Sequence, residues 1–341
     1  MTLKDIAKEA GVSISTVSRV INQKNKKAAS QETQDKIWEI IRKTGYIPNT
    51  AAQNLRRGDR NPEIESTHTI ACIFARTEAD IDNPFFSQLA RCIEEYAYKH
   101  NYIVKYSFTA VDFEHLKSLK FITSIDVDGI VILGRCNRQI LQFLKNNFHF
   151  VIYAGLNPLP KDMKFDQIIC DGLEVSKAAV NHLIELGHKN IAYIGETRNE
   201  IRYTGYRETL AAHRIPINNK NIVSVLLSSD GGYRGAKKLL SQTKDVTAIF
   251  CPNDSTAVGT VHALHEAGIS IPEDISIISV DDIEIAQYIT PMLTTVHIPI
   301  KEMGEMSVKM LIDRIQNGHH IPLKIFLPYY ITKRESCSKP K

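Results

Sequence analysis

The chain has 341 residues, of which 43% are hydrophobic and 23% are charged, so it can bury the cores of more than one domain. It has no apolar run long enough to span a bilayer and no signal-peptide stretch, which argues against a membrane or secreted protein. Its six scattered cysteines form no C-x-x-C pair and predict reduced thiols in the cytoplasm, with neither disulfides nor a zinc site.

Charge is unevenly distributed along the chain, whose net charge is +4. Residues 1–60 hold 12 Lys or Arg against 6 Asp or Glu, whereas the remaining residues hold 30 against 32. A basic N-terminal segment on a nearly neutral body is typical of a protein whose small domain binds a polyanion such as nucleic acid.

The N-terminal segment begins with two short amphipathic helices. Residues 3–10 repeat apolar side chains at helical spacing, and Gly11-Val12-Ser13 then interrupts the helix. Ser13 can cap a second helix, which has two distinct faces. Its apolar face holds Val17, Val20 and Ile21, and its polar face holds Ser15, Ser18, Arg19 and Asn22. This is the helix-turn-helix pattern, whose second helix enters the DNA major groove; the alternative is an ordinary pair of surface helices.

Two further helices are predicted before the pattern changes. Ser30 can cap a third helix that Gly45 ends, with its inward face formed by Ile37, Trp38 and Ile41. After the break at Pro48, Thr50–Arg57 reads as two helical turns. A helix this short is marginal in water, so we expect it to order only when something holds it.

From Thr69 onward, apolar strands alternate with amphipathic helices. Such strands form parallel sheets covered by helices on both faces, and about nine of them fit two doubly wound subdomains better than one. Ligands of such sheets bind beyond the carboxyl ends of the strands. The predicted strands are 70–75, 102–108, 128–133, 150–155, 167–170, 190–195, 222–227, 248–254 and 276–282, with helices such as 84–100, 173–186, 235–241 and 256–267 between them.

Motifs in both parts of the chain resemble those of the LacI/GalR family of bacterial repressors. They follow one another in the order TLKDIAKEAGVSISTVSRVINQ, GYIPNTAAQNL, NPFF, HLIELGHKNIAYIG, CPNDSTAVG, ISVDD and LTTVHIPIKEMG. The likeness is collinear over nearly the whole chain, and the first motif alone is highly specific.

The resemblance implies an α/β fold with a lambda-repressor-like helix-turn-helix head. A periplasmic-binding-protein-like type I sensor follows, made of two doubly wound parallel-sheet subdomains. The expected boundaries are a DNA-binding domain at 1–47, a hinge helix at 48–58, a linker at 59–68 and an effector-binding and dimerisation domain at 69–341.

The resemblance also assigns DNA-binding residues. Ile14, Ser15 and Arg19 match the family's base-reading positions, although core packing is the alternative for Ile14; Arg19 can pair bidentately with guanine. Phosphate contacts suit Thr2, Ser13, Thr16 and Asn22. On the hinge helix, Leu55 matches the leucine that is inserted into the minor groove, and Ala52 matches the small residue beside it. Asn49 can cap this helix and is also expected to contact DNA.

In the sensor, the resemblance assigns effector-binding roles to Arg202, Asn253 and Asp281. A forked cation, an amide and a carboxylate together can satisfy several sugar hydroxyls. Phe86 of the NPFF motif is the expected aromatic floor for the sugar ring, with ordinary helix packing as the alternative. The chain departs from many relatives at Gly155, where they carry an aspartate, so one hydroxyl contact is expected to be missing.

An enzyme was the main competing class. Asp281-Asp282, or a serine with His188, can be imagined as an acid–base set, but the chain has no G-x-S-x-G, P-loop or G-x-G-x-x-G motif in the required context. His262 and His265 lie three apart without a cysteine or carboxylate partner, so surface histidines are favoured over a metal site. We therefore expect no catalysis, no metal and no cofactor.

The sequence thus predicts a cytoplasmic repressor of carbohydrate-utilisation genes that binds a palindromic double-stranded operator. Its repression is expected to be relieved by a small sugar, with galactose or a galactoside as the narrower expectation. The alternative is a corepressor-dependent regulator that responds to a purine or to a phosphoprotein partner. Because the C-terminus lacks the leucine-heptad tail of tetrameric relatives, we expect a homodimer.

Overall fold

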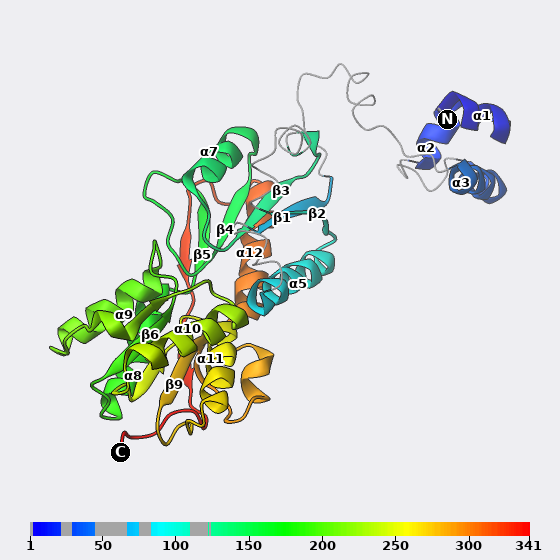
Figure 1. Cartoon of the computed structure of the whole chain (residues 1–341). Coiled ribbons are helices and arrows are strands. Elements are labelled where there is room, and N and C mark those ends of the chain that lie inside the picture. The colour runs from blue at the N-terminus through cyan, green and yellow to red at the C-terminus, as the bar shows by residue number, and fades with distance from the viewer. Residues whose placement is uncertain (1–2, 22–28, 45–66, 75–82, 110–121, 123) are drawn as a thin grey trace. The chain divides into compact units, whose positions relative to one another are not determined.

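The computed structural model describes residues 3–21, 29–44, 67–74, 83–109, 122 and 124–341 (Figure 1). The chain divides into two compact units, residues 1–65 and residues 66–341, and the division falls inside the predicted linker. The predicted hinge helix, Thr50–Arg57, lies outside the described residues.

Within its described residues, the first unit contains the helices α1 (Leu3–Ala10), α2 (Ile14–Ile21) and α3 (Gln31–Thr44). Gly11 has a φ of 73° and ends α1 in the left-handed conformation, which glycine adopts at no steric cost. Ser30 accepts a hydrogen bond from the amide of Thr33 at 3.4 Å, so the predicted cap of α3 is confirmed. The core is formed by small and β-branched side chains of all three helices: Ile6, Ala7, Ala10, Val17, Val20, Ile37 and Ile40.

The described residues of the second unit form two six-stranded sheets. The first sheet has the order β11-β5-β4-β3-β1-β2 and the second β12-β10-β9-β8-β6-β7. All neighbouring strands are parallel except β10 and β12, which are antiparallel. The strands are β1 (Thr69–Phe74), β2 (Ile103–Thr109), β3 (Gly129–Leu133), β4 (Val151–Gly155), β5 (Asp166–Ile169), β6 (Ile191–Gly195), β7 (Ile222–Ser224), β8 (Ala248–Phe250), β9 (Ser276–Asp281), β10 (Thr294–His297), β11 (Lys324–Phe326) and β12 (Tyr330–Thr332).

Helices cover both faces of each sheet, which makes two lobes. In the first lobe, Ile70 and Cys72 of β1 join one core and the alternate residues Ala71 and Ile73 join another, as the two-residue period of a strand requires. Figure 1 shows α7 and α12 on this lobe and α8, α9, α10 and α11 on the other. The helices are α5 (Pro84–Lys99), α7 (Arg138–Asn147), α8 (Gly172–Glu185), α9 (Ile201–Ala212), α10 (Ser229–Gln242), α11 (Asp254–Glu266) and α12 (Ile300–Ile315).

All nine predicted strands are confirmed, and three short strands were missed. The strands β10, β11 and β12 have only three or four residues, and they are hydrogen-bonded at or near the sheet edges by partners distant in sequence. Helix α10 also begins six residues earlier than predicted. Its first turn contains Gly231 and Gly232, which let α10 approach the backbone of Leu226 and Thr256 too closely for any side chain.

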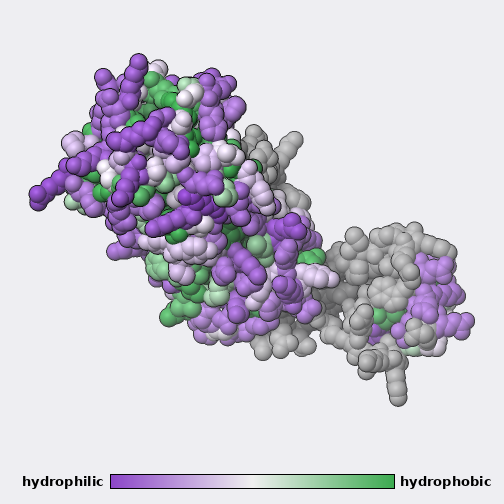
Figure 2. Space-filling view, turned by 90° about the horizontal axis from the view of Figure 1, so that it is seen from below, coloured by the Kyte–Doolittle hydropathy of each residue, from purple (hydrophilic) through white to green (hydrophobic). Residues whose placement is uncertain are grey.

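On the face shown in Figure 2, hydrophilic residues predominate and hydrophobic residues gather in small separate patches. Among the helices of the described part of the chain, none is both long and apolar enough to cross a lipid bilayer.

Candidate functional site

The exposed face of α2 carries the predicted base-reading side chains. Ile14 is 43% exposed, so the alternative of core packing is wrong for this residue. Arg19 is exposed, and its Nε donates to the carbonyl of Ser15, one turn earlier, at 3.2 Å. Since Ser15 is also exposed, α2 presents an isoleucine, a hydroxyl and a guanidinium to solvent.

The beginning of α2 is fixed by its own hydroxyl groups. The amide of Thr16 donates to Ser13 Oγ at 3.1 Å, so Ser13 caps the helix as predicted. Ser13 Oγ also lies 2.8 Å from the hydroxyls of Ser15 and Thr16. The remaining predicted DNA contacts, Thr2, Asn22, Asn49, Ala52 and Leu55, lie outside the described residues.

A polar cavity lies at the carboxyl ends of strands in both lobes of the second unit. We call this cavity, which is open to solvent, the cleft pocket. All four effector residues that the resemblance assigned line it. Its lining consists of Asn83, Phe85, Phe86, Gly134, Arg135, Leu156, Asn157, Glu200, Arg202, Asn253 and Asp281. A parallel sheet places its ligand sites at this end, because chain connections leave crevices there.

Aromatic side chains from the start of α5 form one wall. The side chain of Asn83 accepts from the amide of Phe85 at 3.0 Å and so caps α5. The rings of Phe85 and Phe86 meet edge to face, with centroids 5.1 Å apart. Phe86 also lies against Gly134, whose φ is 79° and where a side chain would collide with the ring. Phe86 therefore packs against Gly134 and also lines the pocket, and its role as the floor for a sugar ring stays a prediction.

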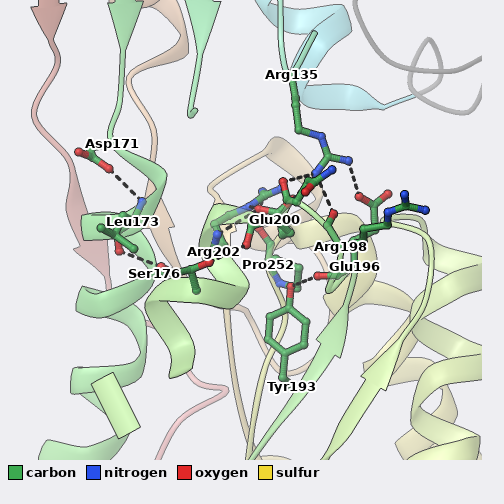
Figure 3. Close-up of polar contacts among 12 residues, drawn as sticks. Arg135, Asp171, Leu173, Ser176, Tyr193, Glu196, Arg198, Glu200, Arg202 and Pro252 are labelled. Carbon is green, nitrogen blue, oxygen red and sulfur yellow. Dashed lines mark hydrogen bonds and ion pairs between the residues drawn. The ribbon is translucent and has the colours of Figure 1, made fainter. Parts of the chain in front are cut away.

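Arg202 is buried at the start of α9 and is held by a carboxylate (Figure 3). Its Nε donates to Glu200 Oε1 at 2.7 Å, Nη2 to Glu200 Oε2 at 3.1 Å, and Nη1 to the carbonyl of Pro252 at 2.6 Å. Burial lowers the pKa of Arg202, but the charge and hydrogen bonds of Glu200, with a contribution from Asp281, raise it above its usual range. The guanidinium of Arg202 thus stays protonated, and the carboxylate of Glu200 balances its charge.

Asp281 is aimed into the pocket by an unusual backbone turn. Asp281 and Asp282 have φ angles of 121° and 60°, which side-chain-bearing residues rarely adopt. Asp282 is fixed by Arg334 Nη2 at 2.6 Å, His297 Nδ1 at 2.9 Å and Thr332 Oγ1 at 3.1 Å. The two aspartates are therefore separated in role, because Asp281 lines the pocket and Asp282 holds the strands β10 and β12.

Two amides complete the polar lining. Asn253 Oδ1 caps α11 by accepting from the amide of Thr256 at 3.0 Å. Asn157 lies just beyond β4, and its side-chain oxygen is buried without a hydrogen-bond partner among the described residues. A buried acceptor of this kind requires a donor, which water or a ligand can supply.

Arg135 joins the two lobes at the rim of the pocket (Figure 3). It follows β3 of the first lobe and donates to Glu196 Oε2 at 2.7 Å and to the carbonyl of Asn199 at 2.6 Å, both in the second lobe. Its Nη1 lies 3.7 Å from Glu200 Oε2. Arg135, Glu200 and Arg202 thus form a chain of alternating charges across the cleft.

Three residues of the cleft pocket were not predicted from the sequence: Arg135, Asn157 and Glu200. Arg135 and Asn157 follow strands, and because ligands of parallel sheets bind beyond the carboxyl ends of strands, both could have been predicted as site residues. Glu200 gives only the weaker signal of an acidic residue before a helix. Its ion pair with Arg202 depends on the fold around the pocket.

The contacts of His188, a residue considered for catalysis, are those of a residue that stabilises the fold. Its ring nitrogens lie 2.9 Å from Thr247 Oγ1 and 2.9 Å from the carbonyl of Ser338, so it fastens the C-terminal segment. In the described part of the chain, no group of three or more His, Cys, Asp or Glu side chains is placed to hold a metal ion.

Two known sequence families match the chain, one within each of its two compact units. Residues 2–49 match the family described as bacterial regulatory proteins, lacI family. Residues 180–337 match the periplasmic binding protein-like domain.

Individual relatives align with almost the whole chain. The HTH-type transcriptional repressor PurR of Glaesserella parasuis is 31% identical over 96% of this chain and 94% of its own length. The ribose operon repressor of Haemophilus influenzae is 32% identical over 98% of both chains. Among solved structures, a LacI family transcriptional regulator from Enterococcus faecium with bound ribose is 32% identical. It covers 80% of this chain and 100% of its own, with a TM-score of 0.70.

Proposed function

Because the chain belongs to the LacI family of bacterial regulatory proteins, we propose that a small sugar bound in the cleft pocket controls its hold on DNA. Members of this family are transcriptional regulators and not enzymes, and this chain is a DNA-binding transcriptional repressor. What remains to be assigned is the effector, the direction of its action and the residues that carry both.

The observation that carries the proposal is the convergence of four residues in one cavity. Phe86, Arg202, Asn253 and Asp281 come from separate elements yet line the same pocket. The pocket combines an aromatic ring with donors and acceptors, and a sugar requires an apolar surface for its ring face and hydrogen bonds for its hydroxyls. The ribose bound to the Enterococcus faecium relative supports a pentose or hexose as the first class to test.

The effector's action follows from the position of the pocket between two lobes. A ligand that contacts both lobes favours one relative orientation of them. We propose that this orientation opposes operator binding, so that sugar and operator weaken each other reciprocally, typically by about 1–3 kcal/mol. A homodimer on a palindromic operator is the simplest arrangement, because two heads related by a two-fold axis match two half-sites.

A purine is the second candidate effector. The PurR relative supports it at an identity close to that of the ribose repressor. A purine base can use the same lining, since its flat ring can lie on Phe86 and its ring nitrogens can bond to amides and carboxylates. Galactose or a galactoside, the narrower expectation, stays a prediction.

The test couples ligand screening to operator binding. Thermal unfolding of the full-length protein is measured with ribose, galactose, cellobiose and hypoxanthine. The compounds that stabilise it are then added to titrations with a palindromic duplex selected from a random pool. The proposal predicts that a sugar raises the melting temperature and weakens operator binding. Stabilisation by hypoxanthine alone, with tighter operator binding, would make the protein a corepressed purine regulator.

A further inference from the structure

Asn157 is a polar residue of the cleft pocket whose side-chain oxygen the fold does not use. This Oδ1 atom is buried, yet it has no hydrogen-bond partner among the described residues. An unpaired buried acceptor costs stability, so such a group in a folded protein indicates a donor from outside the chain. Because Asn157 lines the cleft pocket, a ligand of that pocket can supply this donor.

The backbone is held in place on both sides of Asn157. Before it, the carbonyl of Leu156 accepts a hydrogen bond from the amide of Gly172, at the start of α8, at 2.9 Å. After it comes Pro158, whose ring disfavours helical backbone angles at the preceding residue. Asn157 is therefore presented by a fixed segment, so little conformational entropy is lost when its side chain binds a ligand.

Gly155, the last residue of β4, has no room for a side chain. A Cβ atom there would lie 2.6 Å from the hydroxyl oxygen of Tyr153, which is buried, and 3.4 Å from the Cα atom of Gly134. Among residues 155–158, which lead out of β4, only Asn157 has a polar side chain. Asn157 is therefore the residue at this strand end that can hydrogen-bond to a ligand through its side chain.

Three polar side chains of the first lobe belong to the described lining of the pocket, and two of them are already engaged. Asn83 Oδ1 accepts from the amide of Phe85 at the start of α5, and Arg135 donates to the second lobe. The third is Asn157, whose acceptor remains for a ligand. In the second lobe, Arg202 keeps one N–H on each terminal nitrogen. A ligand bonded to Asn157 and to the second lobe would therefore connect the two lobes.

We infer that Asn157 is the first-lobe anchor of the effector: its Oδ1 accepts a hydrogen bond from one ligand hydroxyl, and this contact couples ligand binding to the orientation of the lobes. The inference rests on the proposed function, since it concerns the ligand of the same pocket. An analogue that lacks this hydroxyl leaves the buried acceptor unpaired, so the pocket rejects it. Asn157 thus sets specificity at one position of the ligand.

The experiment combines ligand analogues with substitutions in the full-length protein. Calorimetric titrations measure ribose and analogues that each lack one of its hydroxyl groups, on the wild type and on Asn157→Leu, which keeps the side-chain size and removes the amide. The variant is expected to bind ribose about tenfold more weakly. Its preference for ribose is expected to be lost for one analogue and kept for the others, because only one hydroxyl donates to Asn157. Asn157→Ala, which cannot overfill the pocket, is expected to show the same loss.

The matched control is Asn147→Leu in the same lobe. Asn147 is the last residue of α7, is exposed, and donates to the carbonyl of Phe143 at 2.8 Å, away from the pocket lining. It is expected to bind ribose and the analogues as the wild type does.

Operator titrations at saturating ribose test the coupling. The factor by which ribose weakens operator binding is expected to be at least about threefold smaller in Asn157→Leu than in the wild type. The reason is that a ligand held by the second lobe alone no longer favours one orientation of the first. An equal factor in both proteins would overturn this part of the inference.

Thermal unfolding without ligand gives a readout that a purely structural role would move in the opposite direction. Asn157→Leu removes an unpaired buried acceptor, so its melting temperature is expected to exceed that of the wild type by about 2 °C. An unchanged or lower melting temperature would show that Asn157 is satisfied within the ligand-free protein, and would overturn the inference.

These outcomes separate the inference from the proposed function. If Asn157→Leu binds ribose with unchanged affinity and selectivity, the inference is overturned and the sugar response stands. If ribose binds through Asn157 but leaves operator affinity of the wild type unchanged, the proposed function fails and the ligand contact stands. If ribose does not bind, the melting temperature of the ligand-free variant decides on Asn157.

Discussion

The exposed face of α2 and the cleft pocket both present an arginine beside small polar groups, but they hold it in different ways. Arg19 is exposed, and its one hydrogen bond given by the structure goes to a carbonyl of its own helix. Arg202 is buried and donates to three acceptors, the two carboxylate oxygens of Glu200 and the carbonyl oxygen of Pro252. The first arginine keeps most of its donors for an external partner, while the second is fixed before any ligand arrives.

This difference teaches how each region achieves selectivity. On α2, a solvated guanidinium costs little to rearrange, so it can adapt to guanine or to phosphate. In the pocket, the buried ion pair is held rigidly and defines the space and charge that a ligand meets. We therefore expect substitutions on α2 to change binding alone, and substitutions in the pocket to change folding stability as well.

The largest expected effect is that of Arg202→Ala. The change leaves Glu200 buried and without its bidentate partner, so the free energy of unfolding should fall by about 3–5 kcal/mol. Denaturant unfolding of the full-length protein measures this, with Arg207→Ala, further along α9, as the control. A loss below about 1 kcal/mol would mean that the pocket does not depend on this ion pair.

The next effect concerns pH and Asp254, which is buried and directly follows Asn253 of the cleft pocket. Burial raises its pKa from 3.8 to about 6, although hydrogen bonds from Ser279, Thr295 and the amide of Ile283 oppose the shift. Because the pKa of this carboxyl is higher in the folded than in the unfolded protein, its protonated form stabilises the fold at low pH. This stabilisation is lost as pH rises from about 3.8 to about 6. Between pH 4 and pH 7 the wild type should therefore lose about 2 kcal/mol of unfolding free energy relative to Asp254→Asn.

Parallel denaturant unfolding curves of the two proteins at each pH measure this difference. The variant controls for all other titrating groups, because they are common to both chains. A wild type that gains stability over the variant as pH rises would show that the carboxylate is preferred in the fold, and that hydrogen bonding outweighs burial at this position.

The smallest effect on stability, and a clear effect on binding, is expected for Arg19→Ala. Because the side chain is exposed, the free energy of unfolding should change by less than about 0.5 kcal/mol. Operator affinity should fall by about 1–3 kcal/mol, with relaxed preference at one symmetric base pair. Titrations on duplexes substituted at each position measure this; an equal loss on every sequence would assign Arg19 to a phosphate.

Much of the fold was predictable from the sequence because the strands are continuous apolar runs between helices. The cap at Ser13 and the turn at Gly11 followed from local chemistry alone. The short strands β10, β11 and β12 were not predictable, since their hydrogen bonds come from strands up to 157 residues away in sequence.

The pocket was predictable only in part. Asn253 and Asp281 follow strands, so topology alone brings them to one edge, and the family resemblance added Phe86 and Arg202. The pairing of Arg202 with Glu200 was missed because nothing in the sequence indicates which carboxylate a buried arginine will take. Likewise, the left-handed turn at Asp281 and Asp282 depends on contacts from β10 and β12.

The most direct test of the central claim is a set of operator titrations of the wild type and Asp281→Ala, each with and without the sugar found by screening. Asp281 lines the cleft pocket and lies far along the chain from α2, so the substitution removes a ligand acceptor and no predicted DNA contact. The account predicts that both proteins bind the operator equally without sugar and that only the wild type releases it when sugar is added. A variant that releases DNA at the same sugar concentration as the wild type would contradict the account, because the effector would then act elsewhere.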